Sequence, residues 1–401
     1  MFKKQKKEIK YLVGDARISK KFLKPFHEII CDFLSKFSEE ILNDRRTKKF
    51  PDVKTLAFWC RKKNILNLKK KFSSKELRLG LGLIFHVTPS NVPTNFAYSL
   101  IFGLLTGNSN IVKVPSKNFP QIDIICAVLK KVLKFKKYSI IKKMITIIRY
   151  SKNDEFSKKI SSISDARLIW GGDETINKFK EFRTPERSKD ITFSDRYSFS
   201  IINSENILKI NNFEFNLLLN RFYNDTFLVD QNACSSPRLI VWTGKKINQA
   251  KLKFWKRLNE VVSKKYDLPE VAAIDKFSHL CKDVIKNKNF KKFKIFSSNI
   301  YTIQLKDLED NSDNIKGKWG FFYEFHVNKL DYISKFINKK YQTLSYYGEK
   351  KENLKEFIIR NNILGIDRVV PIGQALEIGF YWDGYDLNSA LSRIIEVKWK
   401  K

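Results

Sequence analysis

The chain has 401 residues, of which 43% are hydrophobic and 14% aromatic, so it can bury a sizeable core and is long enough for two domains. Lysine and arginine outnumber aspartate and glutamate by 77 to 42, which gives a formal net charge of +35. No stretch approaches the roughly 20 apolar residues of a membrane-spanning helix, and the basic N-terminus leads into charged residues instead of a signal-peptide core. We therefore expect no membrane span and a cytoplasmic location.

The positive charge raises the question of nucleic-acid binding, because clustered lysines and arginines neutralise phosphates. Here the lysines recur in nearly every segment, mostly on the polar faces of expected helices, as Lys130, Lys131 and Lys134 do. We interpret them as solvated helix faces and expect no nucleic-acid partner. A noncatalytic basic module that binds nucleic acid stays open as an alternative.

The spacing of cysteine and histidine argues against disulfide and metal frameworks. The five cysteines form no C-x-x-C pair, and the four histidines show no H-E-x-x-H or comparable spacing. We expect neither a disulfide network nor a bound metal.

The first 200 residues divide into a helical segment and an alternating one. Residues 1–76 carry apolar side chains at helical spacing and predict an N-terminal helical segment. Residues 77–200 are predicted to be a dinucleotide-binding domain, with strands at 81–87, 110–115, 144–148, 167–170 and 190–193 and helices at 94–105, 120–133 and 155–163. Strands alternating with helices at this spacing predict a parallel, doubly wound α/β sheet.

The alternation resumes in residues 201–368, which are predicted to form a second α/β domain. We expect strands at 238–242, 300–305, 321–327 and 343–347, and helices at 213–222, 248–266, 272–286, 330–337 and 353–361. Residues 369–401 are expected to be a return segment with a short helix around 388–395. Because no low-complexity linker is present, we expect the two halves to pack closely.

Three loops follow strands of the predicted first domain, at the edge where ligands collect in open α/β sheets. The first contains Thr88 and Pro89, the second runs from Lys113 to Ser116, and the third contains Gly171 and Gly172. A glycine pair at a helix start exposes backbone amides to a pyrophosphate, although the same pair also makes an ordinary turn. Lys113 could bind a cofactor oxygen or simply mark a strand end.

The predicted second domain carries Cys234 in a loop just before a strand. A cysteine thiolate attacks activated acyl carbons, and an unperturbed thiol with a pKa of about 8.5 is already a few per cent ionised near neutrality. The alternative is a buried structural cysteine, since free cysteine is commonly a small core residue. A nucleophilic cysteine beside a dinucleotide-binding unit suggests thioester redox chemistry.

Five motifs follow one another along the chain: HVTPSNVPT at 86–94, LTGNSNIVKVPSK at 105–117, WGG at 170–172, QNACSSP at 231–237 and WDG at 382–384. Their combined order is far more specific than any single motif. In these motifs the sequence resembles the LuxC-type acyl-CoA reductases, the fatty acid reductases of bacterial bioluminescence within the aldehyde dehydrogenase superfamily, and the similarity covers roughly residues 75–400.

The resemblance implies an aldehyde dehydrogenase-like fold, with a doubly wound cofactor domain packed on a second α/β catalytic domain. It implies that Cys234 is the nucleophile and that Asn91 joins the backbone amide of Cys234 in an oxyanion hole. Without the resemblance, Asn91 is equally well read as a turn residue before Pro93.

The same resemblance assigns the cofactor site. Thr88 and Pro89 belong to the cofactor loop, Lys113 and Ser116 match ribose-contacting positions, and Gly171 with Gly172 begins the helix on the pyrophosphate side. A neutral Ser116 permits the 2′-phosphate of NADPH, because an acidic residue there would repel it.

The implied activity is NADPH-dependent reduction of a fatty acyl thioester to the aldehyde, with acyl-CoA or an acyl-protein as donor. The resemblance also implies an acyl-protein synthetase partner, and we expect a homo-oligomer. A CoA-acylating aldehyde dehydrogenase of short-chain substrates is a further alternative.

One departure from the superfamily concerns the base. Residues 190–195 (DITFSD) lie where hydrolytic aldehyde dehydrogenases carry the glutamate that activates water, and this glutamate is missing. Its absence favours reduction over hydrolysis of the acyl-enzyme, but it leaves the activation of Cys234 unassigned. His86 is near the loops, yet we interpret it as a core histidine.

Overall fold

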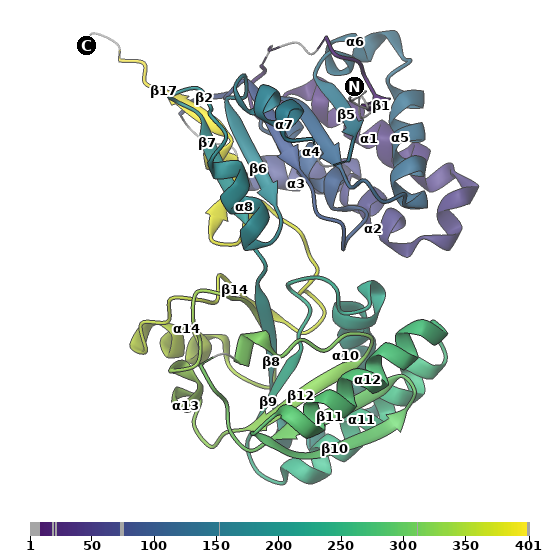
Figure 1. Ribbon diagram of the computed structural model, residues 1–401, viewed down its shortest axis with the longest axis vertical. Helices are drawn as coiled ribbons and strands as arrows, with labels where there is room; N and C mark the ends of the chain where they lie inside the picture. Colours follow the sequence, from purple (N-terminus) through teal and green to yellow (C-terminus); the bar gives the residue numbers. More distant parts are fainter. Residues whose placement is uncertain are drawn as a thin grey trace, which may run out of the picture. The chain divides into compact units, whose positions relative to one another are not determined.

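The computed structural model describes residues 9–17, 20, 22–72, 76–151, 153–310 and 312–398. The chain forms two compact units, drawn in Figure 1. Unit 1 runs to Ser194 and takes in the chain from Phe380 onward, whereas unit 2 comprises Asp195–Gly379. Each unit contains its own sheet and core.

Unit 1 is built on a six-stranded sheet in the order β1-β5-β4-β3-β6-β7. All neighbouring strands are parallel except β1, which is antiparallel to β5. The central strands are buried along almost their whole length, as expected for strands covered on both faces. The strands are β1 (Lys10–Val13), β3 (Leu83–Val87), β4 (Ser109–Val114), β5 (Ile145–Arg149), β6 (Ala166–Trp170) and β7 (Lys189–Phe193).

Helices cover both faces of this sheet. On one face, α7 (Asp154–Ser161) and α8 (Asp173–Lys180) contribute buried side chains to a core shared with β3, β5 and β6. Elsewhere α4 (Asn95–Leu105) packs against β3 and β4, and α1 (Glu28–Asn43) packs on α4 and α5 (Pro120–Val132). The doubly wound sheet predicted for this region is confirmed.

The region of the predicted N-terminal helical segment contains α1, followed by α2 (Pro51–Trp59) and α3 (Lys62–Phe72), and belongs to unit 1. One part of the prediction is wrong, because residues 10–13 form β1 at the edge of the sheet instead of helix. Residues 1–8 of the predicted segment lie outside the described part of the chain.

The C-terminal segment returns to unit 1 as a hairpin, a short helix and a strand. β15 (Tyr381–Trp382) and β16 (Tyr385–Asp386) are joined by Asp383 and Gly384, both at positive φ (47° and 78°), as the favoured two-residue hairpin turn requires. The helix predicted around 388–395 is only partly right. α15 covers Leu387–Ala390, and β17 (Ser392–Ile395) then pairs with β2 (Leu77–Gly80).

Unit 2 contains a seven-stranded sheet in the order β10-β11-β12-β9-β8-β13-β14. All neighbours are parallel except β10, which is antiparallel to β11 at one edge. The strands are β8 (Tyr197–Asn203), β9 (Leu239–Thr243), β10 (Phe290–Ser297), β11 (Ile300–Leu305), β12 (Phe321–His326), β13 (Tyr341–Tyr347) and β14 (Arg368–Pro371).

The two faces of this second sheet are covered by different helices, which makes it doubly wound as well. One core joins the sheet to α9 (Ser204–Lys209), α10 (Asn212–Thr226) and α11 (Ile247–Ser263). The other joins it to α12 (Glu270–Lys286), α13 (Asp331–Ser334) and α14 (Lys351–Arg360).

Strand β8 was not predicted, although it is central. Its sequence alternates aromatic or aliphatic side chains with Ser198 and Ser200, which suggest a polar loop. Both serines are buried and bonded: Ser198 donates to the carbonyl of Cys234 at 2.7 Å, and the hydroxyls of Ser200 and Ser345 lie 2.5 Å apart. These long-range partners satisfy the hydroxyls and allow a central strand.

Among the residues that the structure describes, no helix has the length and apolar character needed to cross a membrane.

Candidate active site

The predicted cofactor loops of unit 1 lie at the switch point of its sheet. From β3 the chain adds β4 and β5 on one side, then crosses to β6 and β7 on the other. The loop with Thr88 and Pro89 follows β3, and Gly171 and Gly172 follow the adjacent β6. Such crevices at carboxyl ends of parallel strands are where doubly wound sheets bind dinucleotides.

Thr88 and Lys113 meet directly. The amide and the hydroxyl of Thr88 donate to the carbonyl of Lys113, at 3.2 and 2.8 Å, so the ends of β3 and β4 are tied together. The Lys113 ammonium lies 5.0 Å from the Tyr150 ring centroid, and burial lowers its pKa. Lys113 therefore offers a partly desolvated cation at the strand ends.

The remaining loop residues are accessible. Pro89 is half-buried, and Asn91 and Ser116 are exposed. Gly172 is the residue before α8 and has no side-chain cap, and a β-carbon added there would meet no atom within 4 Å. Hydroxyl, ammonium and open backbone fit the ribose and phosphate oxygens of a nicotinamide dinucleotide. Asp173 and Glu174 in the first turn of α8 disfavour a phosphate directly on that helix end.

His86 is a core residue, in agreement with its interpretation from sequence. Its ring nitrogens lie 2.8 Å from the hydroxyl of Ser99 and 3.0 Å from the side-chain oxygen of Asn110, and it is fully buried. Burial lowers the pKa of His86 to about 4, so the ring is neutral at physiological pH. It supports packing between β3, α4 and β4.

Cys234 occupies the corner of a turn in unit 2. The amide of Ser236 donates to the carbonyl of Ala233 at 3.1 Å and closes the turn around Cys234, which is partly exposed. The Cys234 carbonyl accepts the Ser198 hydroxyl, which in turn accepts the Thr343 amide at 3.1 Å. The cysteine is thus fixed to β8 and β13 while its side chain stays accessible.

The side chain of Gln231 also fixes the cysteine loop, through hydrogen bonds to backbone groups. Its side-chain oxygen accepts the amides of Gly320 and Phe321 at 2.7 and 3.1 Å, and its side-chain nitrogen donates to the carbonyls of Pro237 and Phe321. Gln231 has positive φ and is fully buried, so these bonds support a backbone shape that non-glycine residues rarely adopt. The resemblance placed Gln231 in the motif without a role of its own.

Two charged residues lie beside the thiol. The Cys234 Sγ lies 3.8 Å from Asp195 Oδ1, in donor geometry toward the carboxylate, and Asp195 Oδ2 is paired with the Lys316 ammonium. Asp195 is the last residue of segment 190–195, where this sequence lacks the glutamate of hydrolytic aldehyde dehydrogenases. No sequence pattern pointed to Lys316, because it is one lysine among many in a loop.

The other cysteines differ from Cys234 in their surroundings. Cys60 and Cys126 are buried, and burial raises the pKa of both thiols, to about 12 for Cys126. Cys31 is partly buried with a raised pKa, and Cys281 is exposed on α12. In the described part of the chain, no three histidine, cysteine or acidic side chains come together as metal ligands would.

The fold matches aldehyde dehydrogenases of known structure. Glyceraldehyde-3-phosphate dehydrogenase from Methanocaldococcus jannaschii, solved in complex with NADP, superposes with a TM-score of 0.65 over 92% of this chain and 88% of its own, at 12% identity. Lactaldehyde dehydrogenase from Escherichia coli gives 0.61 over 91% and 86%, at 13% identity. At such identities the likeness establishes the fold, which confirms the predicted aldehyde dehydrogenase-like architecture.

Sequence comparison points to one family. The long-chain acyl-protein thioester reductase of Vibrio harveyi is 22% identical over 298 residues, which cover 73% of this chain. The chain spans 58% of the length of that relative. The family described as "Acyl-CoA reductase (LuxC)" matches residues 61–396, which is most of the chain. The chain therefore belongs to the LuxC family of acyl-CoA reductases.

Proposed function

We propose that the protein reduces a fatty acyl thioester to the aldehyde with NADPH, through a covalent acyl group on Cys234. The observation that carries this proposal is the accessible Cys234 thiol beside the Asp195 carboxylate, in a chain of the acyl-CoA reductase family. The name of the Vibrio harveyi relative, a long-chain acyl-protein thioester reductase, supports a long-chain substrate.

In the first step the Cys234 sulfur forms a bond to the acyl carbon. The thiol proton passes to Asp195, and the donor thiolate leaves as the old carbon–sulfur bond breaks. Lys316 balances the charge of Asp195 before the transfer. On the family resemblance, Asn91 and the Cys234 amide donate to the acyl oxygen as negative charge develops there.

In the second step the acyl group gains a hydride and Cys234 leaves as thiolate, which releases the aldehyde. NADPH, when bound, supplies that hydride. Thr88, Pro89, Lys113, Ser116, Gly171 and Gly172 are the proposed cofactor-binding residues. NADPH is favoured by the neutral Ser116 and by the NADP complex of one structural neighbour. The donor is proposed to be acyl-CoA or an acyl-protein, the latter with a synthetase as partner.

The deciding experiment is intact-protein mass spectrometry after incubation with acyl-CoAs of different chain length in the absence of NADPH. We expect one acyl adduct, mapped to Cys234, lost in Cys234→Ala and kept in Cys281→Ser, the matched change at the exposed cysteine. Adding NADPH should remove the adduct and release aldehyde. An adduct on Cys281 alone, or none with any donor, would contradict the proposal. A short-chain optimum would favour the CoA-acylating alternative.

A further inference from the structure

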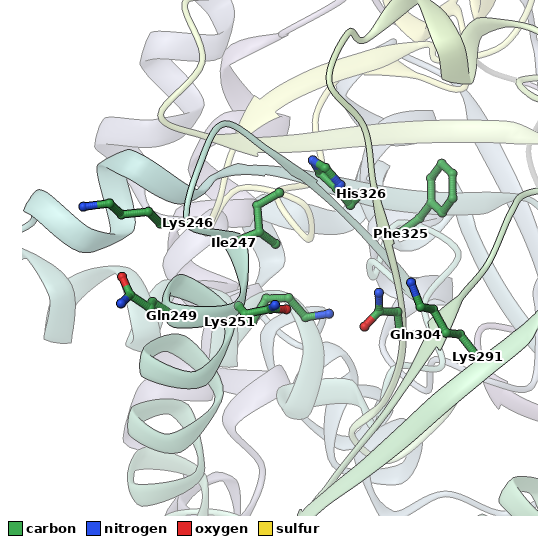
Figure 2. A pocket seen from close by; sticks show the side chains of 9 residues that line it. Lys246, Ile247, Gln249, Lys251, Lys291, Gln304, Phe325 and His326 are labelled. Carbon is green, nitrogen blue, oxygen red and sulfur yellow. The ribbon is translucent and has the colours of Figure 1, made fainter.

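A cavity of about 570 Å³ lies in unit 2 where β9, β11 and β12 end. Its volume falls in the range of small-molecule sites. The cysteine loop lies at the amino end of β9, and the cavity lies at its carboxyl end. The five residues of β9 span roughly 16 Å, and this length separates the cysteine loop from the cavity. The cavity is therefore distinct from the Cys234 site. It is lined by Lys246, Ile247, Asn248, Gln249, Lys251, Lys291, Gln304, Phe325 and His326 (Figure 2).

The ammonium of Lys251 is held in place at this cavity by a buried network. It lies 2.9 Å from Oε2 of Glu324, a carboxylate that is only 3% exposed. The other carboxylate oxygen of Glu324 accepts the indole N–H groups of Trp242 and Trp255, at 2.9 and 2.8 Å. Because an ammonium has three donors and the pair uses one, Lys251 can still donate to a ligand.

An ammonium group, of Lys291, and an imidazole, of His326, also line this space. The pairing of β10 with β11 shifts register between Phe290 and Lys292, which places Lys291 in a bulge, a common means of redirecting a side chain. Lys251, Lys291 and His326 all line this cavity. Burial and the charges of the two lysines lower the pKa of His326, so its imidazole is neutral at physiological pH. In Figure 2, Lys251, Gln304 and Lys291 extend toward one another, whereas Lys246 points away.

Backbone and amide groups add further polarity. α11 begins at Ile247 without a side-chain cap or an acidic residue in its first turn, so its first amides have no intrahelical partner. The buried side-chain oxygen of Gln304 has no hydrogen-bond partner in the described chain. No aspartate or glutamate lines the cavity among the described residues.

We propose that this cavity binds a phosphate-bearing anion of nucleotide size. Two lysines, of which one is preoriented by a buried carboxylate, together with a histidine and a helix N-terminus, form the donor set that phosphate oxygens require. The position at carboxyl ends of parallel strands is the usual ligand position in such sheets. The site is independent of the proposed reaction at Cys234.

The test is isothermal titration of the full chain with inorganic pyrophosphate at low salt, and a pair of lysine variants assigns the binding to this cavity. Lys291→Gln removes a cavity cation, and Lys294→Gln makes the same charge change on the same strand outside the cavity. We expect Lys291→Gln to weaken binding about tenfold and Lys294→Gln to leave it within about twofold, as one charged hydrogen bond predicts.

Titrations with ADP and with coenzyme A distinguish the source of the phosphate. Tighter binding of either one than of pyrophosphate, with the same loss in Lys291→Gln, identifies the preferred ligand and supports the site. The proposal is overturned if pyrophosphate, ADP and coenzyme A all fail to bind the wild-type chain at millimolar concentration. It is equally overturned if both variants lose the same affinity, because general positive charge then accounts for the binding.

Discussion

At the scale of single residues, the contact between Cys234 and Asp195 bears on how the thiol would lose its proton in the proposed reaction. A carboxylate at 3.8 Å accepts a proton during attack but also repels a preformed thiolate, and the Lys316 ammonium offsets that repulsion. The pair therefore suits proton transfer in the transition state. Cys234 is partly exposed, which suits a thiol that must meet a large acyl donor.

We expect Asp195→Asn to slow acylation of Cys234 at neutral pH by about 10²-fold or more, the usual contribution of a general base. The residual rate should rise about tenfold per pH unit toward the ordinary thiol pKa near 8.5, because only preformed thiolate then reacts. Rapid-quench mass spectrometry measures the acylation rate, with Asp275→Asn, the same change at an exposed aspartate of α12, as comparison. A wild-type rate in Asp195→Asn at pH about 7 would exclude Asp195 as the base.

Lys276 illustrates the cost of a buried charge. It is 1% exposed, donates to the carbonyl of Trp319 at 2.7 Å and lies 4.4 Å from the Tyr301 ring centroid. Burial lowers the pKa of Lys276 to about 7. The unfolded chain therefore binds a proton that the folded chain lacks between pH 7 and about 10.4, so this residue makes stability rise with pH across that window.

We expect Lys276→Met to stabilise the protein below pH 7 by about 2 to 4 kcal/mol, the charge-burial cost less the lost hydrogen bond. The gain should shrink as the pH rises from 7 toward about 10.4, because the folded wild-type lysine is then neutral and losing the proton on folding costs less as the pH nears the unfolded pKa. Urea unfolding followed at several pH values measures it. A gain independent of pH would mean that packing, and not charge, sets the effect.

At the scale of elements, α12 presents two different faces. Its inner face buries Ala272, Lys276 and Leu280 against the sheet of unit 2. Its outer face carries large apolar side chains that are each at least 53% exposed, namely Val271, Ile274, Phe277 and Ile285. A contiguous apolar face of this kind is typical of an association surface.

We propose that this outer face of α12 contributes to a homo-oligomer. The double change Ile274→Gln with Phe277→Gln should lower the molar mass measured by light scattering, whereas Lys282→Gln on the same helix should not, because only the first removes buried apolar area at the contact. A wild-type chain that is monomeric at micromolar concentration would refute the assignment.

At the scale of the whole molecule, the excess of 77 basic over 42 acidic residues produces repulsion that salt can screen. We expect the melting temperature to rise by a few degrees between about 0.05 M and 0.5 M NaCl, because screening relieves this repulsion in the compact state. Differential scanning fluorimetry measures the shift. A melting temperature that falls with salt would show that local ion pairs, not net charge, dominate.

The same positive charge bears on the nucleic-acid alternative. RNA binding that weakens steeply between about 0.05 M and 0.5 M NaCl, without turnover of acyl-CoA, would favour that alternative.

The sequence by itself determined the doubly wound architecture of both units and the family to which the chain belongs. Apolar runs such as β3 and amphipathic helices such as α5 carry their pattern locally, so periodicity predicts them. The motif around Cys234 is local as well, and the family assignment that it suggested is confirmed over residues 61–396.

Only the tertiary structure decided the groups that depend on distant partners. The serines of β8 needed Cys234 and Ser345 before they could lie in a central strand, and β10, rich in lysine, is a strand only because β11 pairs with it. Asp195, 39 positions from Cys234 in the chain, meets the thiol, and Lys316, 82 positions from Cys234, pairs with Asp195. Folding brings these residues together. The hydrophobic periodicity of a segment shows which of its faces is buried, and it can be read from that segment alone. Hydrogen-bond and ion-pair partners depend on which distant segments the fold brings together.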